Sequence, residues 1–117
     1  MQISYSRIIN EMMMTDGLSK PMASRILNAI LKNIKLTTSI AKSRTSVIHR
    51  YSIEEKKMHS DYTSFLAWIY ILCAPKKKIS KIHGLGKESV EFILQLRKRH
   101  EFEQRLYNEL AYIVFDF

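Results

Sequence analysis

The sequence predicts an all-α fold, a compact bundle of six or seven helices, and three observations support this class. Its 117 residues include only three glycines and two prolines, fewer than the turns of a strand-rich domain need. Ile, Leu, Met, Lys and Glu dominate the composition, which favours helix. Apolar residues recur at intervals of three and four along most of the chain. With 46% apolar residues, we expect one helical domain over residues 1–117.

The first two helices are expected on either side of Asp16-Gly17. Apolar residues from Tyr5 to Met13 recur at helical spacing, and glycine suits the C-cap that would end this helix. Ser19 is placed to cap the second helix, whose first turn tolerates Pro21. The apolar stripe of this second helix consists of Ala23, Ile26, Leu27, Ile30, Leu31 and Ile34.

The middle of the chain is expected to contain two helices. The first has a weak helical pattern, and the second is strongly apolar. Residues 40–51 fit helical spacing, although their Ser and Thr side chains compete for backbone hydrogen bonds. Ser52 to Glu55 match a capping box, and the helix it opens ends before Pro75. Its stretch FLAWIYILC is apolar on every side, which indicates either the centre of the core or a subunit interface.

The last third of the chain is expected to hold a short basic helix, a glycine corner and two further helices. The basic helix covers KKKISKIH, and Gly84-Leu85-Gly86 forms the corner before a helix that starts at Lys87. Residues 100–117 are expected to form the final helix. Their apolar members fit a period of 3.6 better than alternation: Phe102, Leu106, Leu110, Ile113, Val114 and Phe117.

The charge is strongly positive and unevenly distributed. The net charge is +8, from 19 basic and 11 acidic residues. No Asp or Glu occurs from Gly17 to Ile53, a stretch with seven lysines and arginines, or from Tyr62 to Lys87. From Glu88 onward, acids outnumber bases. Such segregation favours a surface that faces a polyanion.

Two segments with a glycine corner resemble one another. GLSKPMASRILNAI starts at Gly17 and GLGKESVEFILQLR starts at Gly84, and aligned on these glycines they share Gly, Leu, Lys, Ile and Leu. The alignment leaves two interpretations open. The segments are an internal repeat used for binding, or they are two helix corners with glycine C-caps and no ligand.

The downstream segment resembles the helix-hairpin-helix motif of DNA-binding proteins. The motif's apolar, glycine and small positions are matched over about twenty residues by Ile79, Ile82, Gly84, Leu85, Gly86, Val90 and Ile93, with Val90 where alanine is usual. The glycines let the backbone approach a ligand closely, and the amides that open the following helix form an anion site. The residues expected to hold a DNA phosphate there are Lys78, Lys81, His83, Gly84, Gly86 and Lys87.

The upstream segment resembles the second half of a helix-turn-helix. The downstream segment can also be interpreted as this motif. The resemblance implies that residues of the helix after Gly17 face the DNA. These are Ser19, Lys20, Ser24, Arg25 and Asn28. Arginine and asparagine side chains can pair with the edges of guanine and adenine in the major groove.

Signatures of catalysis and of metal binding are missing from the sequence. The four histidines are scattered, and none is spaced with Cys73 or a carboxylate as metal ligands are. Glu101 and Glu103 are interpreted as solvated helix residues rather than as an acid–base pair. Cys73 is interpreted as a core residue. No phosphate-binding loop of the nucleotide-hydrolase kind is present. We therefore expect a protein that is not an enzyme and needs neither a cofactor nor a metal.

The sequence points to a small DNA-binding protein, a transcriptional regulator that contacts double-stranded DNA. A homodimer formed through the apolar helix would double a modest electrostatic footprint. The alternative is a helical adaptor or inhibitor, for example from a phage or plasmid, that binds a protein partner and blocks a nucleic-acid-handling enzyme. The longest apolar run, Phe65 to Ala74, is too short to span a bilayer, and the N-terminus lacks a secretory signal. A cytoplasmic location is expected.

Overall fold

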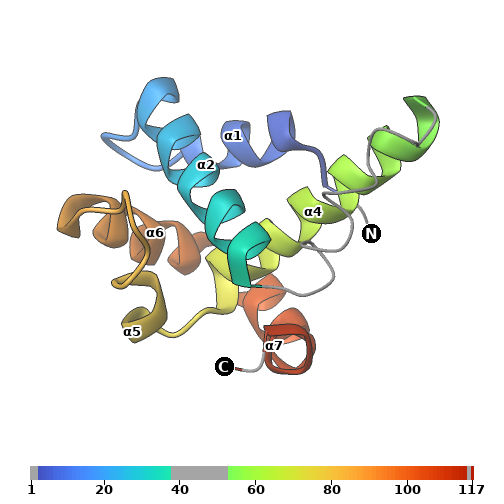
Figure 1. Ribbon diagram of the computed structural model, residues 1–117. Helices are drawn as coiled ribbons and strands as arrows, with labels where there is room; N and C mark the ends of the chain where they lie inside the picture. Colours follow the sequence, from blue (N-terminus) through green and yellow to red (C-terminus); the bar gives the residue numbers. More distant parts are fainter. Residues whose placement is uncertain (1–2, 38–52, 116) are drawn as a thin grey trace.

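The computed structural model describes residues 3–37, 53–115 and 117, with side chains described for residues 3–34, 62–115 and 117. This part of the chain forms six α-helices and no strand, which confirms the predicted all-α class (Figure 1). The helix expected over residues 40–51, and Ser52 of the expected capping box, lie outside the described residues. The helices are α1 (Tyr5–Met13), α2 (Lys20–Thr37), α4 (Ile53–Cys73), α5 (Lys76–Ile79), α6 (Lys87–Arg99) and α7 (Glu101–Phe115).

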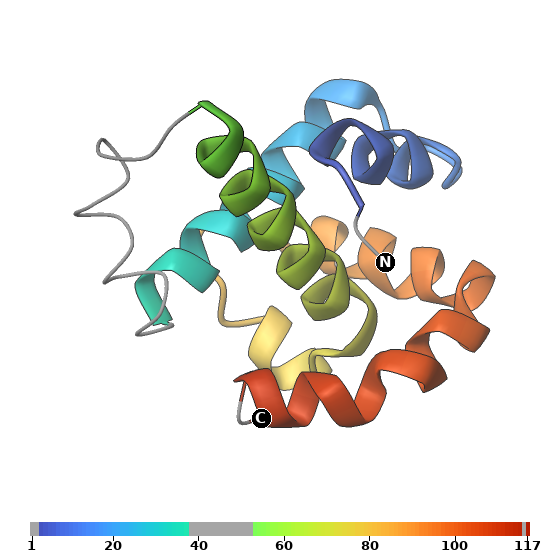
Figure 2. The same ribbon diagram turned by 90° about the vertical axis from the view of Figure 1, so that its right-hand side faces the viewer.

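Helix α4 is the centre of the core. Trp68 and Tyr70 lie about 200° apart around the helix axis, yet their side chains are only 2% and 6% exposed. In Figure 2, α4 runs diagonally through the molecule, with α1 above it and α7 below it. From Ala67 to Ala74 this stretch is therefore buried by other helices of the same chain, whereas Phe65 and Leu66 before it are half-buried. Within the described residues, no helix has the length and apolar content to cross a membrane.

Two arginines at the end of α6 complete the C-terminal ends of other helices. Arg97 donates hydrogen bonds to the carbonyl oxygens of Ile71, at 2.7 Å, and Ala74, at 2.6 Å, at the end of α4. Arg99 donates to the Glu11 carbonyl oxygen at 2.8 Å, at the end of α1. The last carbonyls of a helix lack backbone partners and carry the negative end of its dipole. These two cations therefore serve the fold.

The two glycine corners have the same backbone conformation. Gly17 and Gly84 both have positive φ angles, of 80° and 93°, which side chains with a Cβ rarely adopt. In each segment a helix begins three residues later, at Lys20 and at Lys87. The similarity between the two sequence segments thus extends to their local structure.

Candidate nucleic-acid interface

The two glycine corners pack crosswise: the Gly84 corner contacts α2, and the Gly17 corner contacts α6. A Cβ atom placed on Gly84 would lie 3.6 Å from the Cβ of Ala29 in α2, and one placed on Gly17 would lie 3.5 Å from a ring carbon of Phe92 in α6. These are ordinary van der Waals distances, so the chain passes each helix closely without a clash. The contact brings together the two segments that the sequence singled out, although they lie far apart along the chain.

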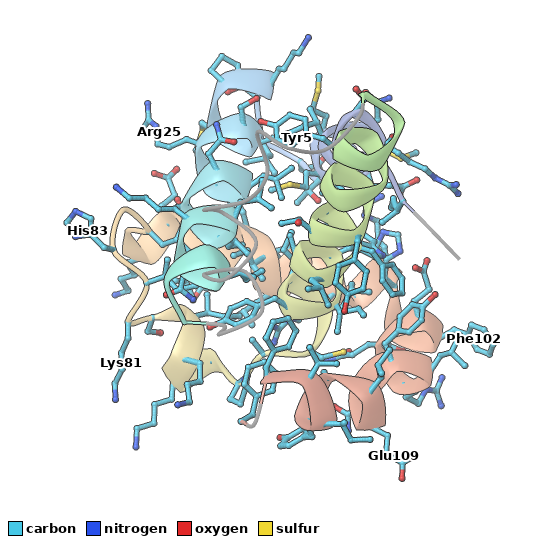
Figure 3. The ribbon with its side chains drawn as sticks, turned by 45° about the vertical axis from the view of Figure 1, so that its right-hand side comes forward. Tyr5, Arg25, Lys81, His83, Phe102 and Glu109 are labelled. Atoms are coloured by element: carbon cyan, nitrogen blue, oxygen red, sulfur yellow. The ribbon has the colours of Figure 1, made fainter. Side chains whose placement is uncertain are left out.

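The Gly84 corner brings basic side chains from two elements to one side of the molecule. Arg25 and Lys32 are helical neighbours of Ala29, four residues before it and three after it. In Figure 3, Arg25 of α2 lies on the same side of the molecule as Lys81 and His83 of the corner. We call this region the basic surface. It consists of the exposed residues Arg25, Asn28, Lys32, Lys81, His83 and Lys87.

The positive charge of the basic surface is available to a ligand. Within the described part of the chain, the ion pairs involve His100 and its two glutamate partners, and no lysine or arginine of the basic surface takes part in one. Lys20 and Lys78, which the sequence analysis also predicts to contact DNA, are exposed as well. A polyanion could approach these cations without displacing an internal partner.

The N-terminus of α6 is open at the position where the sequence places a phosphate. Gly86 is the N-cap residue, with φ −79° and ψ 173°, and no side chain caps the helix. A Cβ on Gly86 would meet nothing within 4 Å. The first amides of a helix have no carbonyl partner within it and face outward. Glu88 lies in the same first turn, and its negative charge offsets part of the attraction for an anion.

The residues predicted for base recognition differ in exposure and in the hydrogen bonds that they already make. Ser19 caps α2, its Oγ accepting a hydrogen bond from the Met22 amide at 3.4 Å, and Ser24 is half-buried. Asn28 is exposed, and its Oδ1 accepts a hydrogen bond from the Tyr5 hydroxyl at 3.1 Å. This bond orients the Asn28 side-chain amide through its oxygen. Arg25 is exposed.

The two motifs are reproduced only in part. Residues 14–19 separate α1 from α2, a longer connection than the turn of three or four residues in a helix-turn-helix. Helix α5, which would be the first helix of the hairpin, has four residues. Val90 is buried, so the helix accommodates a branched residue where the motif usually has alanine.

The comparisons with known proteins assign no family to this chain. No family model matches the chain, and no curated protein or solved structure matches it significantly. The function has to be inferred from the chemistry of the surface itself.

Two residues of the basic surface and its surroundings were not foreseen from the sequence. Lys32 lies seven residues after Arg25, so helical spacing already places it on the same face of α2. Tyr5 is recognisable only in the folded chain, because its contact with Asn28 spans 23 residues. Helical spacing is thus sufficient to place Lys32, whereas the role of Tyr5 depends on tertiary structure.

A second polar cluster joins α1, α4 and α7 around His100. Nδ1 of His100 lies 3.2 Å from Oε1 of Glu103, and Nε2 lies 3.4 Å from Oε2 of Glu11. The Trp68 indole donates to Oε2 of Glu103 at 3.1 Å. The interpretation of Glu103 as a solvated residue is therefore wrong, because its carboxylate ties α7 to the core.

The cavity beside His100 is too small to be a ligand site. Its volume is about 50 Å³, whereas pockets for small organic molecules measure roughly 300 Å³ or more. Among the described residues, no group of three histidine, cysteine or acidic side chains could hold a metal ion. The cluster around His100 is best understood as a polar clamp between helices.

Proposed function

We propose that this protein binds double-stranded DNA through the basic surface and acts as a transcriptional regulator. The observation that carries the proposal is the packing of Gly84 against Ala29, at 3.6 Å for an added Cβ, which joins two acid-free segments into one cationic region. Each segment contributes two cations to the basic surface, Arg25 and Lys32 from one and Lys81 and Lys87 from the other. Together they offer several cations to the phosphates of one duplex, whose neutralisation supplies the sequence-independent part of binding.

The two parts of the surface have different roles in this proposal. Lys81 and Lys87, beside the open N-terminus of α6, contact phosphates, which fixes the position of the protein without reading sequence. Arg25 and Asn28 of α2 are exposed and have side chains that can pair with the edges of guanine and adenine, so we assign base recognition to them. The Tyr5 hydroxyl supports the second role by orienting Asn28.

The test is the salt dependence of binding to a labelled random-sequence duplex, measured by fluorescence anisotropy between about 50 and 200 mM salt. Each phosphate contact contributes about −0.9 to the slope of log K against log salt. The double variant Lys81→Gln/Lys87→Gln should therefore flatten the slope by about two and weaken binding at low salt. Each single variant, Lys81→Gln or Lys87→Gln, should flatten the slope by about one. Lys98→Gln is the matched control for these single variants, because it removes one positive charge from the opposite end of α6.

The control should keep the parental slope. A parent that fails to bind duplex at the lowest salt, or whose slope is unchanged by the double variant, contradicts the proposal. A pull-down from the native host would then test the alternative class, an adaptor or inhibitor with a protein partner.

A further inference from the structure

Helix α7 is apolar on two sides, and only one of them is covered by the chain. Its inner side packs on α4, where Ala111 is fully buried and the ring of Tyr107 meets that of Phe65 edge-on at 5.6 Å. Its outer side carries a second row of large apolar residues, at intervals of four, four and three. We call this row the α7 stripe: Phe102, Leu106, Leu110 and Ile113, which are 74%, 60%, 39% and 77% exposed.

The size of the α7 stripe indicates that it is covered in the working protein. The four side chains leave roughly 400 to 500 Å² of apolar surface in contact with water, which is as large as the largest patch on most monomers and is often functional. The neighbouring Tyr112 ring, 48% exposed, extends it. Two such faces in contact would bury about 1,000 Å², the lower limit for a specific interface.

The charges beside the α7 stripe select a second copy of this chain as the partner. Arg105 and Glu109 lie on the same flank of the stripe, four residues apart, and both are exposed. Neither forms an ion pair within the described part of the chain. If a two-fold axis perpendicular to α7 passes near residues 107 and 108, the two α7 helices of the dimer run antiparallel. Each Arg105 then faces Glu109 of the other copy. The apolar rows then meet along their whole length.

The charge of α7 argues against a membrane as the occupant. Helices that lie on a bilayer surface carry Lys and Arg on their polar side. The polar positions of α7 include Glu101, Glu103 and Glu109 against a single Arg105, so an anionic lipid surface would repel the helix. A self-complementary pattern of one cation and one anion suits an isologous contact instead.

We propose that α7 is the contact of a symmetric homodimer, in which two antiparallel copies bury the α7 stripe. This surface lies on the other side of the molecule from the basic surface: Figure 3 shows Phe102 on one side and Arg25, Lys81 and His83 on the other. Dimerisation would leave both basic surfaces uncovered. The proposal does not depend on DNA binding, and its test uses no DNA.

The experiment is sedimentation equilibrium of the full chain from about 1 to 500 µM, a range that brackets the modest affinity expected of an interface near the lower size limit. The parent should dimerise, and Ile113→Glu should raise the dimer Kd at least tenfold. Met14→Glu is the control, because Met14 is also a large exposed apolar residue, at 66%, but lies outside α7. It should leave the Kd unchanged. Circular dichroism and urea unfolding would verify that each variant keeps its fold.

A charge exchange tests the antiparallel geometry. Arg105→Glu alone should weaken the dimer, because two glutamates would then face one another. The double variant Arg105→Glu/Glu109→Arg should restore most of the lost affinity, because it reverses both partners of each pair. A parent that remains monomeric throughout the range, an Ile113→Glu variant with the parental Kd, or a double variant no better than Arg105→Glu would overturn the proposal.

Discussion

At the scale of single residues, the two glycines of the downstream corner have different tasks. Gly84 adopts a φ of 93°, where an added Cβ is strained even though the space beside Ala29 is sufficient. Gly86 has an extended backbone that any residue can adopt, and nothing lies near its would-be Cβ. Gly84 is thus needed for the turn, whereas Gly86 is needed only if a ligand approaches.

Matched substitutions separate these tasks. Gly84→Ala should lower the free energy of unfolding by about 1–2 kcal/mol, because the left-handed conformation is unfavourable for alanine. Gly86→Val should leave helix content largely intact, at an N-cap cost of about 1 kcal/mol or less, yet remove duplex binding, because its branched side chain would block a phosphate. Urea unfolding and anisotropy measure the two effects. A Gly86→Val variant that binds DNA like the parent would make the corner purely structural.

Substitutions in α2 test whether its side chains recognise bases. On a preferred sequence, selected first from a random duplex pool, Arg25→Ala or Asn28→Ala should cost about 1–3 kcal/mol of binding, with little effect on random DNA. Tyr5→Phe should have a smaller effect of the same kind, because it removes only the hydrogen bond that orients Asn28. Equal losses on both kinds of DNA would assign these side chains to the phosphates. A pool that yields no enriched sequence would count against a regulator.

At the scale of helices, the ends of α1 and α4 are completed by side chains from α6. Arg97 is largely enclosed, and burial lowers the pKa of its guanidinium from the ordinary value, with Cys73 and Tyr70 opposing the shift. Arginine nevertheless stays charged in proteins. Its two hydrogen bonds therefore combine a cation with carbonyls at the negative end of the α4 dipole.

Removing this cap should destabilise the whole bundle. Arg97→Met keeps an apolar stem of similar length but leaves the carbonyls of Ile71 and Ala74 without their donors, which should cost about 2–3 kcal/mol. Lys98→Met, at the exposed neighbouring position, should change stability by less than about 0.5 kcal/mol. Urea unfolding monitored by circular dichroism compares the two. Equal stabilities would mean that water replaces the guanidinium at this helix end.

At the scale of the whole molecule, the core makes stability depend on pH in the alkaline range. Burial raises the pKa of the Cys73 thiol, partly offset by the Arg97 charge. Burial also raises the pKa of the Tyr70 hydroxyl, against a hydrogen bond from Asn33 and the charge of Arg97. Groups with a raised folded-state pKa contribute stability that is complete below their unfolded-state pKa and is lost as pH rises through the folded-state value.

The free energy of unfolding should therefore fall as pH increases above about 8.5, the ordinary pKa of a cysteine thiol. Cys73→Ala should be less stable at neutral pH, because it leaves a small cavity, but its stability should fall less steeply between pH 8 and 10. Urea unfolding at each pH gives both curves. Parallel curves for the parent and the variant would show that the thiol does not titrate on unfolding.

The sequence by itself determined the class of fold and most of the helix boundaries. Helical spacing, Ser19 as a cap, Pro75 as a stop and the glycines at 17 and 84 are local features, and their effects act within a few residues. The same local information showed that positive charge is concentrated in two acid-free segments. It also placed Cys73 in the core, where the structure finds it.

Only the tertiary structure decided which of these features meet. The apolarity of the stretch around Trp68 fits a core or an interface equally well. Packing of α1, α2 and α7 on α4 made it core, whereas the α7 stripe stayed exposed. Glu103 was drawn into a cluster with His100 and Trp68. The packing of Gly84 on Ala29 likewise joins two segments that are distant in the sequence. Periodicity shows that a face is apolar, but what covers that face depends on contacts between residues remote in the chain.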